Sequence, residues 1–306
     1  MDVGAVHAQQ DGPAIACRGL TKDYGSGHGV FALDLEVRRG EVYGFIGANG
    51  AGKTTTMRLI MDLIRPDSGG VQVFGLDARR DSLAVKRRVG YLPGELAQWP
   101  GVTAAHVVGL LGGLRGGVEA ARIDSLASRL QLDLSRRFAD LSHGNKQKVG
   151  LLCAFMHRPE LLILDEPTLG LDPLMQREVR ALIEEAVADG ATCLLSSHVL
   201  AEVELVCDRI GLIRDGRLLR QGTLAELRQL RAHRVTAVIP SRPEAASLAA
   251  VDGVTEVEAR DDHYSCTVHG PATALLGWLH AAGAVELDSR ELSLEEVFLA
   301  EYRPAS

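Results

Sequence analysis

The chain of 306 residues is long enough for one large α/β domain and a smaller second domain, each with its own hydrophobic core. Its 33 Lys and Arg are outnumbered by 40 Asp and Glu, and the net charge of −7 excludes a generally basic surface that would follow a phosphate backbone. We therefore expect no nucleic-acid partner.

The five cysteines are scattered along the chain, and no two of them form a C-x-x-C pair. This pattern favours neither a disulfide framework nor a zinc site, and it is typical of a reducing cytosol. Residues 1–12 do not resemble a secretory signal, and the most apolar stretches, 107–114 and 161–164, are far shorter than the roughly 20 residues that span a bilayer. Any role at a membrane is expected to depend on a partner protein.

Short apolar runs alternate with helical patterns between residues 14 and 230, which indicates a mainly parallel sheet covered by helices. Residues 1–13 are expected to form an N-terminal tail. The pattern becomes helical between about residues 95 and 145 and is interrupted by glycines, so a helical insertion is predicted there. The predicted strands of the sheet are 42–46, 161–164, 192–196 and 210–213.

Residues 47–54 match the phosphate-binding motif G-x-x-x-x-G-K-[ST] in full, between the strand predicted at 42–46 and a helix-like run at 55–64. Glycines let backbone N–H groups converge on an anion, and the following helix presents its positive N-terminal end to it. A glycine-rich turn that binds nothing is disfavoured, because the motif and its context coincide. The expected nucleotide-binding residues are Gly47, Asn49, Gly50, Ala51, Gly52, Lys53, Thr54 and Thr55.

Two side chains of this motif have distinct expected roles. Lys53 supplies a positive charge for the β- and γ-phosphates of a nucleoside triphosphate. The Thr54 hydroxyl is the expected Mg²⁺ ligand, since Mg²⁺ prefers hard oxygen donors. By itself, the loop predicts only that a nucleoside triphosphate binds.

Two acids, Asp165 and Glu166, end the apolar strand at 161–164, which places them at the carboxyl edge of the sheet, beside the phosphates. Asp165 suits Mg²⁺ binding through water, and Glu166 suits polarising an attacking water molecule. His198 follows another predicted strand, and we expect it to contact the γ-phosphate. The alternatives, a solvated acidic turn and a structural histidine, are disfavoured by the phosphate loop. The expected catalytic residues are Lys53, Glu166 and His198.

A second domain is predicted for residues 231–306. Its elements occur in the order strand, helix, strand, strand, helix, strand, which is the pattern of a small α+β, ferredoxin-like domain. A last helix is expected to begin at Ser293, because Glu296 three residues later completes a capping box. The preceding elements are predicted at residues 235–239, 243–250, 254–259, 264–268, 271–282 and 285–287.

Residues 141–148, with the sequence LSHGNKQK, resemble the signature sequence of ABC ATPases, the element that separates them from other phosphate-loop proteins. The resemblance implies a P-loop ABC cassette that binds ATP and Mg²⁺. It also implies a head-to-tail homodimer, in which Ser142 and Gly144 of one subunit close over the γ-phosphate held by Lys53 of the other.

Two further nucleotide-site residues rest on the same resemblance. Tyr24 is similar to the aromatic residue that stacks on adenine, and Asp172 to an aspartate of the dimer interface. From the residues alone, Tyr24 is as often a surface or core residue, and Asp172 could cap a helix before Pro173.

The chain departs from the family pattern at several positions. His143 and Asn145 stand where the common signature has Gly and Gln, a form similar to that of drug and antibiotic exporters. Gly94 stands where the family usually has a Gln that contacts Mg²⁺ and relays to the membrane subunit. Glu95 and Gln98 are candidates to replace that Gln.

The C-terminal residues 292–299 resemble the accessory domain of exporter ATPases of the daunorubicin-resistance type. This implies an ATPase on the cytoplasmic face of the cell membrane, powering ABC-2-type export of a drug, antibiotic or lipid-like molecule. Integral membrane permease subunits would bind the substrate. An import ATPase is an alternative that the Gly at position 94 disfavours. A soluble ABC protein acting on ribosomes or DNA is another, disfavoured because the chain has neither a second cassette nor a long coiled coil.

Overall fold

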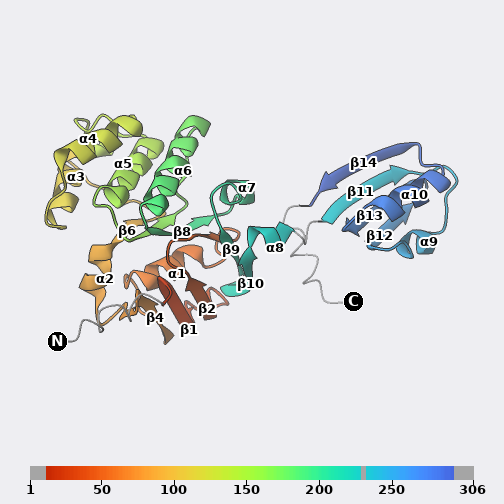
Figure 1. The fold of residues 1–306 in the computed structure, drawn as a ribbon, viewed down its shortest axis with the longest axis horizontal. Coiled ribbons are helices and arrows are strands. Elements are labelled where there is room, and N and C mark those ends of the chain that lie inside the picture. Colours follow the sequence, from red (N-terminus) through yellow and green to blue (C-terminus); the bar gives the residue numbers. More distant parts are fainter. Residues whose placement is uncertain (1–11, 229–231, 293–306) are drawn as a thin grey trace, which may run out of the picture. The chain divides into compact units, whose positions relative to one another are not determined.

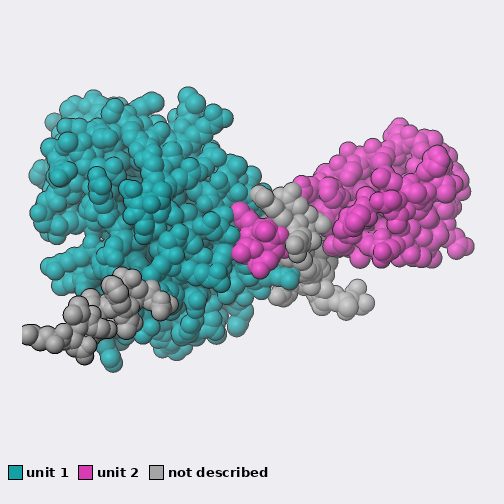
Figure 2. All heavy atoms as spheres, in the orientation of Figure 1, with its two compact units in different colours: residues 1–222 teal, residues 223–306 magenta. Residues whose placement is uncertain are grey.

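The computed structural model describes residues 12–228 and 232–292. They belong to two compact units that divide between Gly222 and Thr223, and Figure 2 colours the two units separately. Each unit has its own hydrophobic core. The helix predicted to begin at Ser293 lies outside the described residues.

The first unit is built around a six-stranded sheet with the spatial order β10 (Arg217–Thr223), β9 (Arg209–Arg214), β3 (Val42–Ile46), β8 (Thr192–Ser197), β7 (Leu161–Asp165) and β6 (Val89–Leu92). Figure 1 labels β6, β8, β9 and β10 of this sheet. β3 pairs in parallel with β8 and β9. β7 pairs in parallel with β8 and β6. The mainly parallel α/β core that the sequence predicts is confirmed.

A separate antiparallel sheet has the spatial order β2 (Gly29–Val37), β1 (Ile15–Asp23), β4 (Ser68–Val73) and β5 (Leu76–Asp77). The alternation of apolar and polar residues did not reveal it. Register shifts interrupt the pairing of β1 with β2 between Cys17 and Leu20, and with β4 between Arg18 and Thr21. Such irregularities break the strict period of two by which a half-buried strand is recognised.

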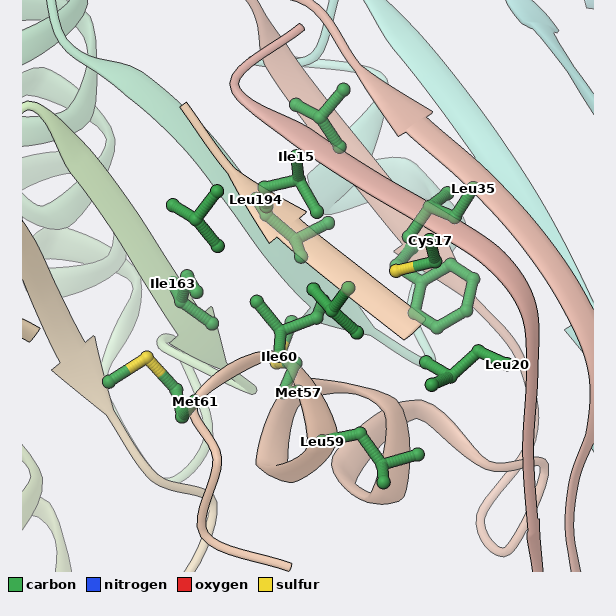
Figure 3. Packing of buried hydrophobic residues seen from close by; sticks show 14 of the residues in the cluster. Ile15, Cys17, Leu20, Leu35, Met57, Leu59, Ile60, Met61, Ile163 and Leu194 are labelled. Carbon is green, nitrogen blue, oxygen red and sulfur yellow. The ribbon is translucent and has the colours of Figure 1, made fainter. Parts of the chain in front are cut away.

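Helix α1 (Lys53–Ile60) lies between the two sheets, and its apolar side chains fill the main core (Figure 3). Met57 and Ile60 are fully buried in one cluster with Ile15 of β1 and with Ile163 and Leu194 of the parallel sheet. Burying a side chain of this size contributes about 1.5–3 kcal/mol. This packing fixes the N-terminus of α1 relative to the ends of β3, β7 and β8.

α1 is shorter than the helical run predicted at residues 55–64. It begins two residues earlier, directly at Lys53, and it ends at Ile60. Asp62 adopts a φ of +50°, which a continuing α-helix does not allow.

The predicted helical insertion contains α3 (Ala104–Gly113) and α4 (Ala120–Arg129), followed by α5 (His143–Phe155). Gly116 and Gly117 have φ values of +90° and +101°, so the chain turns between α3 and α4 at residues that tolerate this conformation. α5 packs against α3 and β6. Further α-helices of the unit are α2 (Ser82–Arg88), α6 (Pro173–Ala188) and α7 (Leu200–Val203).

The second unit begins with α8 (Leu224–Arg228) and contains an antiparallel sheet with the spatial order β12 (Val254–Arg260), β13 (His263–His269), β11 (Ala232–Val238) and β14 (Glu286–Glu291). Helices α9 (Ala245–Ala249) and α10 (Thr273–Ala281) contribute Leu248, Leu275 and Leu279 to its core. The order of elements and the pairing confirm the ferredoxin-like prediction. In the described ranges of both units, no helix combines the length and apolar character needed to cross a membrane.

Candidate nucleotide site

The phosphate loop connects β3 to α1 at the carboxyl edge of the parallel sheet. A Cβ on Gly47 would lie 2.3 Å from the carbonyl oxygen of Ile213, so only glycine fits there. Gly50 and Gly52 have φ values of +83° and +111°, which strongly favour glycine. Gly52 directly precedes α1, and the free amides of that helix's first turn therefore begin at the loop.

The Lys53 side chain lies inside the loop and is 6% exposed. Its Nζ donates to the carbonyl oxygens of Gly47 and Ala48 and lies 3.3 Å from Glu166 Oε1. Of the other predicted loop residues, Ala51 is buried, Asn49 is exposed and Thr55 is half-buried.

Asp165 is fully buried at the end of β7 and is held by two hydroxyl groups. Thr54 Oγ1 donates to Asp165 Oδ2 at 2.7 Å, and Ser196 Oγ donates to Oδ1 at 2.6 Å. Ser196 Oγ also accepts from the Glu166 amide at 3.0 Å. The sequence interpretation gave Ser196 no role. One signal for Ser196 was available in the sequence: it lies at the polar end of an otherwise apolar strand. In the sheet, that strand is the neighbour of the strand that ends in the two acids.

The charge of Asp165 acts on one neighbour in β6. Burial and, to a smaller extent, the charge of Asp165 raise the pKa of Tyr91 to about 12. Tyr91 therefore remains neutral at physiological pH and adds no second negative charge beside Asp165.

Glu166 has an unusual backbone conformation and one carboxylate oxygen that makes no hydrogen bond to the described residues. Its φ is +50°, which is uncommon for a residue other than glycine and is typical of functional sites. His198 Nδ1 lies 2.9 Å from Glu166 Oε2. Among the described residues, buried Glu166 Oε1 has no hydrogen-bond partner, although Lys53 Nζ is nearby. The three residues predicted as catalytic thus lie together.

These groups are suited to a metal bound jointly with phosphate. In the described ranges, no cluster of three His, Cys, Asp or Glu side chains could hold a metal ion by itself. Thr54 and Asp165 offer two hard oxygen donors, which suits Mg²⁺ because that ion keeps several waters and takes further oxygens from a substrate's phosphates. The matching anion site is provided by the phosphate loop, the N-terminus of α1 and the Lys53 side chain.

The structure leaves no room for a side chain at Gly94, where the expected relay Gln is missing. A Cβ there would lie 2.8 Å from Asp165 Oδ2. Of the two candidate replacements, Glu95 is exposed, and Gln98 Oε1 accepts from Lys146 Nζ at 3.4 Å. Gln98 is therefore tied to α5 through Lys146.

The signature residues form the beginning of α5. Ser142 is the N-cap, and its Oγ accepts from the Asn145 amide at 3.3 Å. A Cβ on Gly144 would lie 2.8 Å from the carbonyl oxygen of Gly170, so α5 packs closely on the loop that follows Glu166.

Asp172 and Tyr24 border the site in different ways. Asp172 Oδ1 accepts from the Leu174 and Met175 amides at 3.0 Å, so this residue caps α6. Tyr24 is 55% exposed in the turn between β1 and β2. That turn borders the phosphate loop, because Gly29, at the start of β2, has its carbonyl oxygen 3.1 Å from the position of a Cβ on Gly52.

Comparison with known proteins decides the family. The domain described as ABC transporter matches residues 30–169. A daunorubicin resistance ATP-binding protein of Streptomyces coeruleorubidus is 33% identical over 299 residues, which cover 94% of this chain and 95% of that protein. This chain belongs to the ABC transporter family of ATP-binding proteins. As in the prediction, it is an ABC-type ATPase whose nucleotide is ATP.

Other ABC proteins agree with this assignment. A bacitracin transport ATP-binding protein of Enterococcus faecalis is 37% identical over 216 residues, 70% of each chain. A solved structure described as the ATP binding subunit of an ABC transporter has a TM-score of 0.65 and 32% identity, covering 71% of this chain and 92% of that one. A dimeric ATP-binding cassette bound to ADP and Pi, with a TM-score of 0.63 and 23% identity, supports the fold alone.

Proposed function

We propose that this chain is the ATP-hydrolysing subunit of an exporter for a drug, antibiotic or lipid-like molecule. The similarity to the daunorubicin resistance protein carries the proposal, because it extends over both units rather than over the ATP-binding domain alone. Relatives named for resistance to linearmycin and for bacitracin transport point in the same direction. No observation favours import, or action on ribosomes or DNA.

The phosphates of ATP would lie against the loop amides and the Lys53 ammonium group. The Lys53 side chain is little exposed, and its Nζ already donates to a carbonyl oxygen of the loop. Thr54 Oγ1 and Asp165 would hold Mg²⁺, Asp165 through water. When bound, this ion neutralises developing charge on the β- and γ-phosphates. Asn49, Thr55 and the loop glycines shape the same cradle.

Glu166 would act as the base for the attacking water. Its Oε1 makes no hydrogen bond to the described residues, although it is ion-paired with Lys53, and His198 holds Oε2 and thereby restricts the rotation of the carboxylate. A positioned base typically contributes 10² to 10⁴ in rate. His198, which is 39% exposed, would also reach the γ-phosphate.

We further propose a head-to-tail homodimer with two composite sites. Ser142 caps the N-terminus of a helix of 13 residues and Gly144 lies in its first turn, and the positive end of such a helix favours a phosphate. In the dimer, this helix end would face the phosphates bound at Lys53 of the other subunit. Asp172 would lie at the interface while capping α6, and Tyr24 would stack on adenine beside the loop.

The ATPase would work on the cytoplasmic face of the membrane, bound to permease subunits that contact the substrate. We assign residues 14–230 to the ATP-binding domain, with the helical insertion at about 95–145, and residues 231–306 to an accessory domain, although the two compact units divide slightly earlier, between Gly222 and Thr223. Residues 1–13 form the tail in this assignment.

Purification of the tagged chain from membranes of its native host tests this proposal. We expect an integral membrane protein to copurify, with its bound small molecule identified by mass spectrometry. Recovery of the chain with ribosomes or DNA, and without any membrane protein, would contradict an export role while leaving ATP hydrolysis intact.

A further inference from the structure

The loop from Glu166 to Asp172 is attached to helix α5 at two points. Gln147, which is 2% exposed, donates from Nε2 to the carbonyl oxygen of Glu166 at 3.0 Å. Near the start of the same helix, the close approach of Gly144 to the carbonyl oxygen of Gly170 leaves no room for a side chain. α5 therefore touches this loop both at the proposed base and four residues further along.

The bond from Gln147 acts directly on the backbone of Glu166. A φ of +50° at a glutamate persists only where the surroundings hold it. The Glu166 amide is held by Ser196 Oγ, and the Glu166 carbonyl by Gln147. One side of the residue is thus fixed by the parallel sheet and the other by α5.

We propose that Gln147 is a positioning residue that couples the N-terminus of α5 to Glu166 of the same chain. The proposal rests on the proposed function, in which Ser142 and Gly144 contact ATP bound to the other subunit. Ser142 and Gln147 are only roughly 7–8 Å apart along the axis of one helix, so a displacement at the helix start reaches Gln147. Occupancy of one ATP site would then adjust the base of the other.

The chain offers a matched control on the same loop. Gln176 of α6 donates from Nε2 to the carbonyl oxygen of Leu171 at 3.2 Å. This is the same type of bond, from a glutamine side chain to a loop carbonyl, but it comes from α6 and not from α5. Loss of this bond reports on general loop order without changing the link to the signature helix.

The test compares Gln147→Met and Gln176→Met in the full chain, each alone and in a Glu166→Gln background. Methionine keeps the length of glutamine and lacks the donor. For Gln147→Met we expect kcat to fall about tenfold, with the Kd for ATP within about twofold of the parent, as for loss of one buried hydrogen bond. Gln176→Met should keep kcat within about twofold. In the Glu166→Gln background, Gln147→Met should cause no further loss, because it acts through Glu166.

Three results would overturn the proposal: unchanged kcat in Gln147→Met, an equal loss in Gln176→Met, or an undiminished further loss in the Glu166→Gln background. If Gln147→Met does not fold, Gln147→Leu provides the same test with a branched side chain. Full activity of Glu166→Gln by itself would instead refute the base role in the proposed function. The two failures are therefore distinguishable.

Discussion

Replacement of Gly94 by alanine should disturb the Asp165 carboxylate without replacing any charged residue. The new Cβ would lie 2.8 Å from Asp165 Oδ2 and 3.2 Å from its Cγ. Asp165 is fully buried and already held by Thr54 and Ser196, so it cannot move aside freely. Overpacking of this kind costs about 1–3 kcal/mol. For a unit of this size, the expected fall in Tm is about 2–12 °C.

The same displacement of the Asp165 carboxylate should weaken Mg²⁺ binding and lower Mg²⁺-dependent ATP hydrolysis. Shifting a carboxylate that supports a metal typically lowers affinity or activity about 10- to 100-fold. The assays are thermal unfolding and ATP hydrolysis as a function of Mg²⁺ concentration. Gly109→Ala in α3 is the control, because a Cβ there meets no atom within 4 Å. Since alanine is the better helix former, this control should gain about 0.5–1 kcal/mol.

The backbone of Gly94 needs no left-handed conformation, so the prediction depends on steric contact alone. A Gly94→Ala chain with a Tm within about 1 °C of the parent and with unchanged Mg²⁺ dependence would refute it. That result would mean that the Asp165 carboxylate is free to move.

Three further predictions concern stability. Burial, and then the charge of Arg115, lower the pKa of His157 to about 4 from its usual 6.5. Below pH 6.5 the unfolded chain therefore binds a proton at His157 that the folded chain does not bind. The free energy of unfolding should consequently fall by about 1–3 kcal/mol as the pH is lowered from 6.5 to 4, a range that allows for the partial exposure of the His157 side chain. Urea titrations of His157→Gln should show a smaller fall across this window. Asp172→Ala removes the cap of α6 and should lower the free energy of unfolding by about 1 kcal/mol, whereas Asp172→Asn should nearly retain it in the same titration. Ser196→Ala leaves one oxygen of buried Asp165 without its hydrogen-bond donor, and the free energy of unfolding, measured by thermal unfolding, should fall by about 1.5–3 kcal/mol.

The parallel core and the phosphate loop were predictable because each has a strong local signal. The central strands are continuous apolar runs, and the loop has a fixed glycine spacing after one of them. β14 was only partly recognised, at residues 285–287, because all six of its residues are exposed and its length is set by pairing with β11. Non-local pairing of this kind leaves no periodic pattern in the sequence.

Within the site, the sequence indicated which residues meet but not how they are held. Lys53, Glu166 and His198 were expected together, since parallel strands end at one edge of the sheet. The bridging role of Ser196 and the bond from Gln147 depend on side-chain directions across the sheet and across α5. Such directions follow from packing, which a single sequence does not specify.

The central claim is that ATP is hydrolysed at the phosphate loop with Glu166 as the base. Its most direct test is ATP turnover of Glu166→Gln, compared with the parent at ATP concentrations that saturate both chains. The substitution keeps the shape and hydrogen-bonding capacity of the side chain but removes the base. We expect turnover to fall by about 10²-fold or more with ATP affinity retained, and ATP to drive this variant into a dimer in sedimentation experiments. Equal turnover in the two chains would contradict the account.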